Sequence, residues 1–198
     1  MVISNVKVFG LEDAIIGSKY PMSVDTSKCT AEITPTVKKL GTSPKGEGHD
    51  TFLNGIVVEF DLTFTVKAWT EAERYSHLNF ISSESTMHRI AKFDYDEQYI
   101  DYVDPRMIEI MKELRDRYNE TQDPEDYLKL LYSNPCGFKL TAKMVTNYRQ
   151  LKTIYAQRKT HRLKEWVSFC KEIEELKNNG FSVETKEFHG YCWNTIAW

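Results

Sequence analysis

Residues 58–66 alternate between apolar and polar side chains, and this alternation restricts the fold more than any other feature of the chain. The apolar positions are Val58, Phe60, Leu62, Phe64 and Val66. Successive side chains of a strand point to opposite faces of a sheet, so all five would lie on one face. The sequence therefore predicts a β-sheet with one buried face and one face in contact with water.

Shorter patterns predict further elements on both sides of this strand. Weak alternation predicts a short strand over residues 2–9. Thr34 followed by Pro35 is typical of a helix N-cap, and Gly41 would end that helix. Thr70 and Glu73 would form a capping box for a helix that begins at about Glu71. Later helices are expected over 105–118, 124–134, 139–159 and 162–178.

Together these elements predict an α+β fold, with a small mixed or antiparallel sheet packed with long helices. The length of 198 residues favours a single domain that spans residues 1–198, with 180–198 as a candidate C-terminal extension. The sequence FSVETKEF, residues 181–188, would add a strand there.

Composition argues against several classes of protein. Hydrophobic content of 41% and charged content of 28% are ordinary for a soluble globular protein. No apolar run approaches a membrane span, and the first residues lack the layout of a signal peptide, so a cytoplasmic protein without a membrane partner is expected. The cysteines form no CxxC pair, which disfavours a zinc site or a disulfide framework. The histidines lack metal-ligand spacing, so no metal site is predicted.

Residues 127–164 contain no Asp or Glu but nine Lys and Arg residues, although the whole chain has a formal net charge of -3. This local positive charge suits a phosphate or carboxylate ligand; a solvated basic face is the alternative. A nucleic-acid partner is not expected, because the total charge and the stretch 94–126 are acidic.

Within the basic segment, four residues share one face of the predicted helix: Asn147, Leu151, Ile154 and Arg158. Its two polar ends would lie about 16 Å apart. They could hold a long ligand over an apolar floor, or the two apolar residues could lie in the core with polar ends that reach solvent.

A second candidate is the segment Ser82-Ser83-Glu84-Ser85-Thr86, in which four of five residues carry a hydroxyl, followed by His88 and Arg89. Its donors could surround a phosphate, and a polar turn is the alternative. No catalytic triad and no glycine-rich phosphate loop can be assembled, so an organic cofactor would supply the reactivity of any enzyme here.

Three segments resemble the flavin-dependent thymidylate synthases. Residues 48–64, GHDTFLNGIVVEFDLTF, resemble that family's GH-[ED]-[ST] motif and the strand after it. Residues 74–89 occupy the place of its Arg-His-Arg signature with spaced Ser and Arg residues. Residues 146–158, TNYRQLKTIYAQR, are similar in spacing to its N-x-R-x-L-x-[NH]-F-x-x-L-R helix.

The resemblance implies that family's fold and a homotetramer that holds FAD between subunits. It also implies the reaction: NADPH reduces the flavin, methylenetetrahydrofolate donates a one-carbon unit, and dUMP becomes dTMP without an enzyme nucleophile. The ligand would be a pyrimidine deoxynucleotide, and dUMP methylation or a closely related reaction would be the activity.

The resemblance also assigns residues. Arg158 falls on the catalytic arginine that contacts the pyrimidine, where a fixed guanidinium suits developing charge. The cofactor-binding positions are His49, Thr51, Arg74, Ser76, Asn147, Arg149 and Thr153. The other substrate-binding positions are Glu71, Ser83, Glu84, Ser85 and Arg89, together with Arg74, which touches both ligands.

The chain departs from the family's pattern at charged positions. The Arg-His-Arg signature reads Arg74-Tyr75-Ser76, Met87 stands where an arginine is expected, and Thr153 replaces an Asn or His. Each lost charge-assisted hydrogen bond weakens binding by about 1.5–3 kcal/mol. The alternative function is therefore a catalytically degenerate module that binds a nucleotide or a protein on the same scaffold. In either case Arg158 is expected to be replaceable by Ala with little effect on the fold.

Overall fold

The computed structural model describes residues 2–44 and 46–179. The strands are β1 (Ile3–Phe9), β2 (Val57–Thr65), β3 (Asn79–Ser83) and β4 (Lys139–Asn147). The α-helices are α1 (Leu11–Ser18), α2 (Pro35–Gly41), α3 (Val66–Ala72), α4 (Thr86–Arg89), α5 (Tyr95–Gln98), α6 (Pro105–Thr121), α7 (Pro124–Tyr132), α8 (Tyr148–Arg158) and α9 (Lys164–Asn179). Short 3-10 helices lie at Tyr20–Met22, Thr26–Lys28, Thr51–Gly55 and Ile90–Lys92. The strand and the extension predicted after residue 179 lie outside the described residues.

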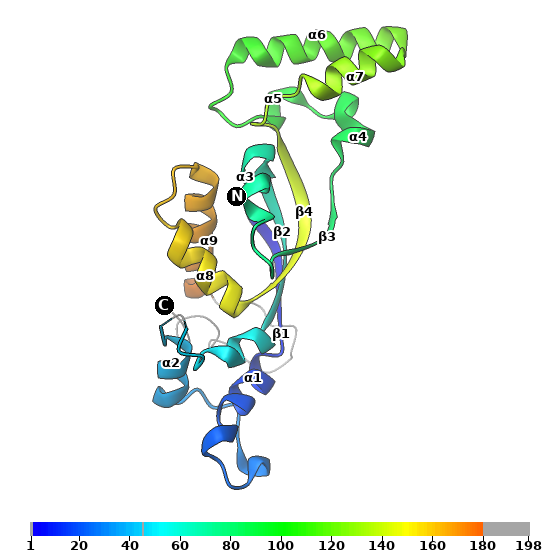
Figure 1. Ribbon diagram of the computed structural model, residues 1–198. Coiled ribbons are helices and arrows are strands. Elements are labelled where there is room, and N and C mark those ends of the chain that lie inside the picture. Colours follow the sequence, from blue (N-terminus) through cyan, green and yellow to red (C-terminus); the bar gives the residue numbers. More distant parts are fainter. Residues whose placement is uncertain (1, 45, 180–198) are drawn as a thin grey trace.

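The four strands form one antiparallel sheet in the order β1-β2-β4-β3, which confirms the α+β prediction (Figure 1). The predicted alternation of β2 is also confirmed, since Val58, Phe60, Leu62 and Phe64 are all buried. The last apolar residue of the pattern, Val66, is instead the first residue of α3.

The single helix predicted over 139–159 is wrong in its first half, because residues 139–147 form β4. This strand pairs with β2 without a register shift, from Val57 opposite Asn147 to Thr65 opposite Lys139. Its buried positions Ala142, Met144 and Thr146 alternate with half-buried ones. The pairing gives the central strand β2 its second neighbour, and this long-range pairing overrides the local helical pattern.

The capping box predicted at Thr70 is also wrong. The N-cap of α3 is Thr65, whose hydroxyl oxygen accepts a hydrogen bond from the Ala68 backbone N–H at 3.2 Å. Thr70 lies inside α3, and its hydroxyl donates to the Lys67 carbonyl. Both threonines precede a backbone N–H that they could cap, but α3 begins directly after β2 ends at Thr65, so Thr65 is the cap and Thr70 lies within the helix.

Aromatic side chains join the sheet to α9. The Phe64 ring lies 4.7 Å from Trp166 and 6.0 Å from Phe169, both edge to face. The same core continues to Leu151 and Ile154 of α8, so α8 and α9 cover one face of the sheet (Figure 1). This arrangement fixes both ends of α8 against other elements of the chain.

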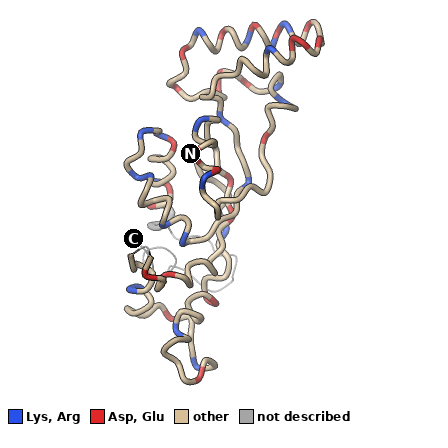
Figure 2. Tube along the Cα trace, viewed as in Figure 1, with Lys and Arg blue, Asp and Glu red and all other residues tan. Residues whose placement is uncertain are grey.

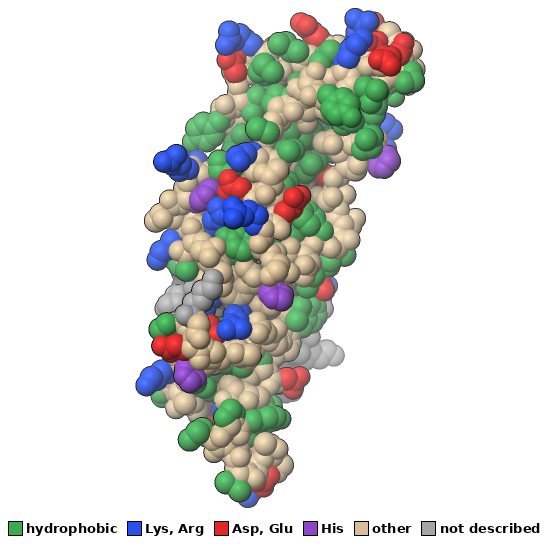
Figure 3. Space-filling model, viewed as in Figure 1, with side chains coloured by type: hydrophobic (Ala, Val, Ile, Leu, Met, Phe, Trp, Pro, Cys, Tyr) green, Lys and Arg blue, Asp and Glu red, His purple; other side chains and the backbone are tan. Residues whose placement is uncertain are grey.

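A second hydrophobic cluster lies under α6 and α7, at one end of the elongated molecule (Figure 1). Phe138 is at its centre, with edge-to-face contacts to Phe93, Tyr95 and Tyr99. Hydrophobic side chains also gather on the surface of this end (Figure 3). Those exposed on α6 and α7 include Met107, Ile110, Leu128 and Tyr132.

Most of the basic segment 127–164 is paired with carboxylates. Five of its cations make ion pairs: Lys129, Lys143, Arg149, Lys152 and Arg158. The charged side chains of the turn between α8 and α9 are mainly Lys and Arg, whereas α6 carries both positive and negative side chains (Figure 2). The segment is therefore neither a continuous free basic face nor a fully solvated one. In the described chain, no helix combines the length and apolar composition of a membrane span.

Candidate functional site

The two ends of α8 hold the polar clusters that form the candidate site. We call Asp50, Arg149 and Lys152 the N-terminal cluster, because the two cations lie in the first turns of α8. We call Glu71, Tyr75, Arg158, His161 and Trp166 the C-terminal cluster, because Arg158 ends α8. Both clusters join α8 to segments about 80–110 positions away in the chain.

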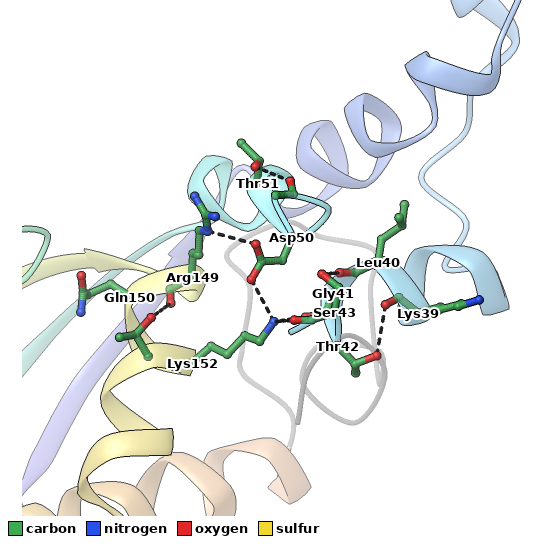
Figure 4. Close-up of polar contacts among 12 residues, drawn as sticks. Lys39, Leu40, Gly41, Thr42, Ser43, Asp50, Thr51, Arg149, Gln150 and Lys152 are labelled. Carbon is green, nitrogen blue, oxygen red and sulfur yellow. Dashed lines mark hydrogen bonds and ion pairs between the residues drawn. The ribbon is translucent and has the colours of Figure 1, made fainter. Parts of the chain in front are cut away.

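In the N-terminal cluster a buried carboxylate lies between two cations (Figure 4). Asp50 Oδ2 accepts from Lys152 Nζ at 2.9 Å, and Asp50 Oδ1 lies 3.1 Å from Arg149 Nε. Lys152 Nζ also donates to the carbonyls of Gly41 and Ser43, at 2.8 and 2.7 Å. All three N–H groups of Lys152 are therefore used, and none remains for a ligand.

Arg149 differs from Lys152, because only its Nε is engaged. Its side chain is 35% exposed, and its two Nη nitrogens have no partner within the described residues. An arginine presents its five N–H donors in a rigid planar fork, so an ion-pair contact through Nε leaves the donors of both Nη groups available. The side chain can therefore offer donors to an anionic or carbonyl-bearing ligand at the start of α8.

The structure brings five of the predicted cofactor-binding residues to this end of α8. His49 and Thr51 flank Asp50 and are exposed. Asn147 caps α8, with Oδ1 accepting from the Gln150 N–H at 2.8 Å, and Thr153 donates to the Arg149 carbonyl at 3.1 Å. The hydroxyl of Thr51 donates to the carbonyl of Gly48. The other two predicted cofactor residues, Arg74 and Ser76, lie exposed in the turn after α3.

In the C-terminal cluster the guanidinium of Arg158 already has several partners. Its Nε donates to the Tyr75 hydroxyl at 2.7 Å, and its Nη1 donates to Glu71 Oε2 at 2.9 Å. The same Nη1 lies 2.7 Å from His161 Nε2. The guanidinium carbon lies 4.8 Å from the Trp166 ring centroid, within cation–π distance. Only Nη2 has no partner within the described residues.

These contacts decide between the two interpretations of α8 and correct one expectation. Leu151 and Ile154 are 2% and 0% exposed, which confirms the alternative that they lie in the core, and they form no apolar floor for a ligand. Arg158 is not an exposed end, because its side chain is 14% exposed. Its replacement by Ala would leave the half-buried Glu71 without its guanidinium, so an effect on the fold is expected.

The remaining predicted substrate residues lie between the last residue of β3 and the last residue of α4. Ser83 and Glu84 are exposed, and Glu84 exchanges hydrogen bonds with the backbone of Thr141. Ser85 precedes α4, its hydroxyl makes no capping bond, and Arg89 is exposed. No hydrogen bond or ion pair of the described residues links this loop to either cluster.

Cysteine chemistry is not part of either cluster. Burial raises the pKa of the Cys170 thiol to about 12, so it stays protonated at neutral pH. A protonated thiol is a poor nucleophile, and Cys170 is part of the core beside Trp166 and Phe169.

Sequence reasoning did not identify several members of the clusters. Asp50 and Lys152 were not singled out, and neither were Tyr75, His161 and Trp166 as partners of Arg158. One local signal existed for Asp50: an acid at the third position of GHD, directly between two predicted ligand residues. The partners of Arg158 come from three different segments, and only the fold brings them together.

Solved structures of known proteins share this fold. A flavin-dependent thymidylate synthase from Helicobacter pylori, complexed with FAD and dUMP, matches with a TM-score of 0.68 and 14% identity. The match covers 88% of this chain and 93% of that one. The chain has the fold of the flavin-dependent thymidylate synthases.

Two further structures support this thymidylate synthase fold. A second structure of the Helicobacter pylori enzyme with FAD and dUMP gives a TM-score of 0.64 at 15% identity, covering 87% of this chain and 92% of that one. The UMP/dUMP methylase PolB from Streptomyces cacaoi, bound with 5-Br dUMP, gives 0.60 at 15% identity, covering 87% and 88%. No protein-family model and no curated protein sequence matches the chain.

Proposed function

We propose that the protein binds FAD and a deoxyuridine nucleotide and methylates the nucleotide, converting dUMP to dTMP with NADPH and methylenetetrahydrofolate as co-substrates. The observation that carries the proposal is the pairing of segments 48–51 and 147–153 at one end of α8, on a thymidylate synthase fold. These are the two segments whose motifs resemble flavin-contacting motifs, and they lie about 100 positions apart in the sequence.

The N-terminal cluster has suitable donors for FAD. The Nη groups of Arg149 and the side-chain amide Nδ2 of Asn147 have no partners within the described residues, and His49 and Thr51 are exposed beside them. The positive end of the α8 dipole lies at the same place and favours negative charge. Bound FAD, once reduced, supplies the reducing equivalents of the reaction.

The C-terminal cluster would hold the pyrimidine. Arg158 Nη2 is the guanidinium nitrogen left for a ring carbonyl, and Tyr75 and Trp166 keep the guanidinium plane fixed. A fixed cation stabilises negative charge that develops on the ring without reorganisation during the reaction. Glu71 is the counterion of Arg158, and a bound nucleotide would share the guanidinium with it.

The phosphate would be bound by the loop that follows β3, through Ser85 and Arg89. Because no described bond joins this loop to either cluster, one complete site would combine segments from different copies of the chain. The exposed apolar side chains Phe80, Ile81 and Met87 flank the loop and could be covered by another copy. These features support self-association with sites at subunit boundaries, and we propose a homotetramer.

Spectroscopy and a coupled assay test the proposal. The purified protein, with FAD added, is expected to show a flavin absorbance spectrum that stays with the protein through gel filtration. Addition of dUMP and methylenetetrahydrofolate is expected to start NADPH oxidation and formation of dTMP. A protein that retains no flavin would contradict the proposal.

A specific observation favours the second candidate, a nucleotide-binding module without turnover. Tyr75 stands at the histidine position of the signature, and its hydroxyl accepts the hydrogen bond of Arg158 Nε. Ser76 stands at the second arginine position of the signature and carries no charge. If FAD and dUMP bind but no NADPH is oxidised and no dTMP forms, this binding function replaces the catalytic one.

A further inference from the structure

Asp50 is the least exposed charged residue of the N-terminal cluster. The residue is 3% exposed, its side chain 5%. Burying a carboxylate is unfavourable unless cations and hydrogen bonds compensate for the lost water. Here one oxygen has a hydrogen bond from Lys152, whereas Oδ1 makes no hydrogen bond and has only its ion-pair contact with Arg149 Nε.

This asymmetry gives the two cations different roles. Lys152 is saturated by Asp50 and the carbonyls of Gly41 and Ser43, so it anchors the carboxylate to the loop after α2 (Figure 4). Arg149 faces the other oxygen with Nε alone. Movement of Arg149 away from the carboxylate would leave the buried Oδ1 without any partner, so the ion pair keeps the guanidinium beside Asp50, with Nε 3.1 Å from Oδ1.

We propose that Asp50 is a positioning residue for FAD: it fixes Arg149 through Nε so that the two Nη groups face the cofactor. The inference rests on the proposed function, since FAD is the ligand that Arg149 would contact. A flexible arginine loses conformational freedom when it binds a ligand, and an arginine that is already held loses less. Asp50 itself does not touch the cofactor in this proposal.

Two simpler roles for Asp50 predict different results. If Asp50 only clamps the loop, its replacement lowers stability but leaves the FAD affinity of the folded protein unchanged. If it only contributes negative charge near an anionic ligand, its replacement raises FAD affinity. Positioning of Arg149 predicts the opposite sign, a loss of affinity that depends on the presence of Arg149.

The test is a double-mutant cycle with Asp50→Asn, Arg149→Ala and the double variant, read by FAD titration and by thermal unfolding without FAD. Asp50→Asn is expected to weaken FAD binding about tenfold, equivalent to about 1.4 kcal/mol. In the Arg149→Ala background the same substitution is expected to change affinity less than about twofold. Thr65→Ala, which removes a helix cap outside both clusters, is the control for lost stability and is expected to keep the wild-type affinity.

Three results would overturn the inference. One is a wild type that binds FAD and an Asp50→Asn variant that binds FAD with equal or higher affinity. That result leaves the proposed function intact. Another is an undiminished effect of Asp50→Asn in the Arg149→Ala background. The third is a wild type that binds no FAD, which removes the proposed function as well. If Asp50→Asn does not fold, the double variant Asp50→Asn, Lys152→Met takes its place in the cycle. That variant folds without a buried ammonium group that has lost its carboxylate, and its FAD affinity is compared with and without Arg149→Ala.

Discussion

Nη1 of Arg158 donates to Oε2 of Glu71 over 2.9 Å, although 87 positions separate the two residues. The bond joins the last turn of α3 to the last residue of α8, so the two helix ends are fixed relative to each other. Both residues are predicted to bind substrate, and in this structure each is the other's counterion. A nucleotide that enters this site must therefore share Arg158 with Glu71 rather than find a free cation.

Arg158→Ala is expected to abolish dUMP-dependent NADPH oxidation and also to destabilise the protein. Glu71 would lose its guanidinium partner while only 22% exposed, at a cost of about 1.5–3 kcal/mol in the free energy of unfolding. Urea unfolding and the coupled assay measure the two effects. Lys159→Ala is the control at the next position, which is exposed, and its stability is expected to stay within about 0.5 kcal/mol of the wild type. Unchanged turnover by Arg158→Ala would remove Arg158 from the proposed mechanism.

Thr65→Ala and Thr70→Ala test which threonine begins α3. Thr65 caps the Ala68 N–H and donates to Glu165 Oε1 at 2.6 Å, so its replacement is expected to cost about 1–2 kcal/mol of stability. Thr70 lies inside the helix and is exposed, so Thr70→Ala should change stability by less than about 0.5 kcal/mol. Urea unfolding of the two variants decides the matter, and a larger loss for Thr70→Ala would restore the capping box.

Two helix starts follow from local signals in the sequence. Thr34 and Pro35 predict the start of α2, and the helix expected over 105–118 does begin at Pro105, because a cap residue followed by a first-turn proline is a local feature. The sequence alone predicts a helix over all of β4, because its partner strand β2 is about 80 positions away. Only long-range pairing shows that Thr141–Thr146 alternate across a sheet rather than around a helix.

In the candidate site, too, the local motifs could be predicted from the sequence and the long-range contacts could not. The sequence motifs identify residues 48–51 and 147–153 as candidates, but their proximity depends on the way α8 packs beside the 3-10 helix at Thr51–Gly55. Asp50 could be suspected from its place in GHD, whereas its pairing with two cations could not. The sequence alone predicts that Arg158 can be replaced by Ala with little effect on the fold, because only the fold places the rings of Tyr75 and Trp166 against its guanidinium.

Gly10→Ala is expected to destabilise the protein by at least about 2 kcal/mol. Gly10 has a φ of 73°, a left-handed conformation, and an added Cβ would overlap the backbone carbonyl oxygen of Gly55. Gly17→Ala is the control, because nothing lies within 4 Å of its added Cβ and the residue is helical. That variant should be neutral or up to about 1 kcal/mol more stable. Equal stability of the two variants in urea unfolding would contradict the close approach of Gly10 to Gly55.

The contact between α6 and α7 is expected to make stability depend on pH in the acid range. Hydrogen bonds from Lys129 and Arg117 lower the pKa of Asp126 to about 2, against about 3.9 for an unfolded Asp. A carboxyl group with a lowered pKa in the folded state stabilises the protein above the unfolded pKa. That contribution is lost as the pH falls from about 4 toward about 2.

Asp126→Asn removes this dependence while keeping the size of the side chain. The variant is expected to unfold at a lower temperature than the wild type at pH 6, and the difference should shrink steadily as the pH falls below about 4, because the wild-type carboxylate becomes protonated. Asp101→Asn is the control, since Asp101 is exposed and makes no hydrogen bond or ion pair with the described residues. Thermal unfolding of the three proteins between pH 6 and pH 2.5 measures the effect. A wild-type advantage over Asp126→Asn that stayed constant across this range would show that the charge of Asp126 does not hold α7 against α6.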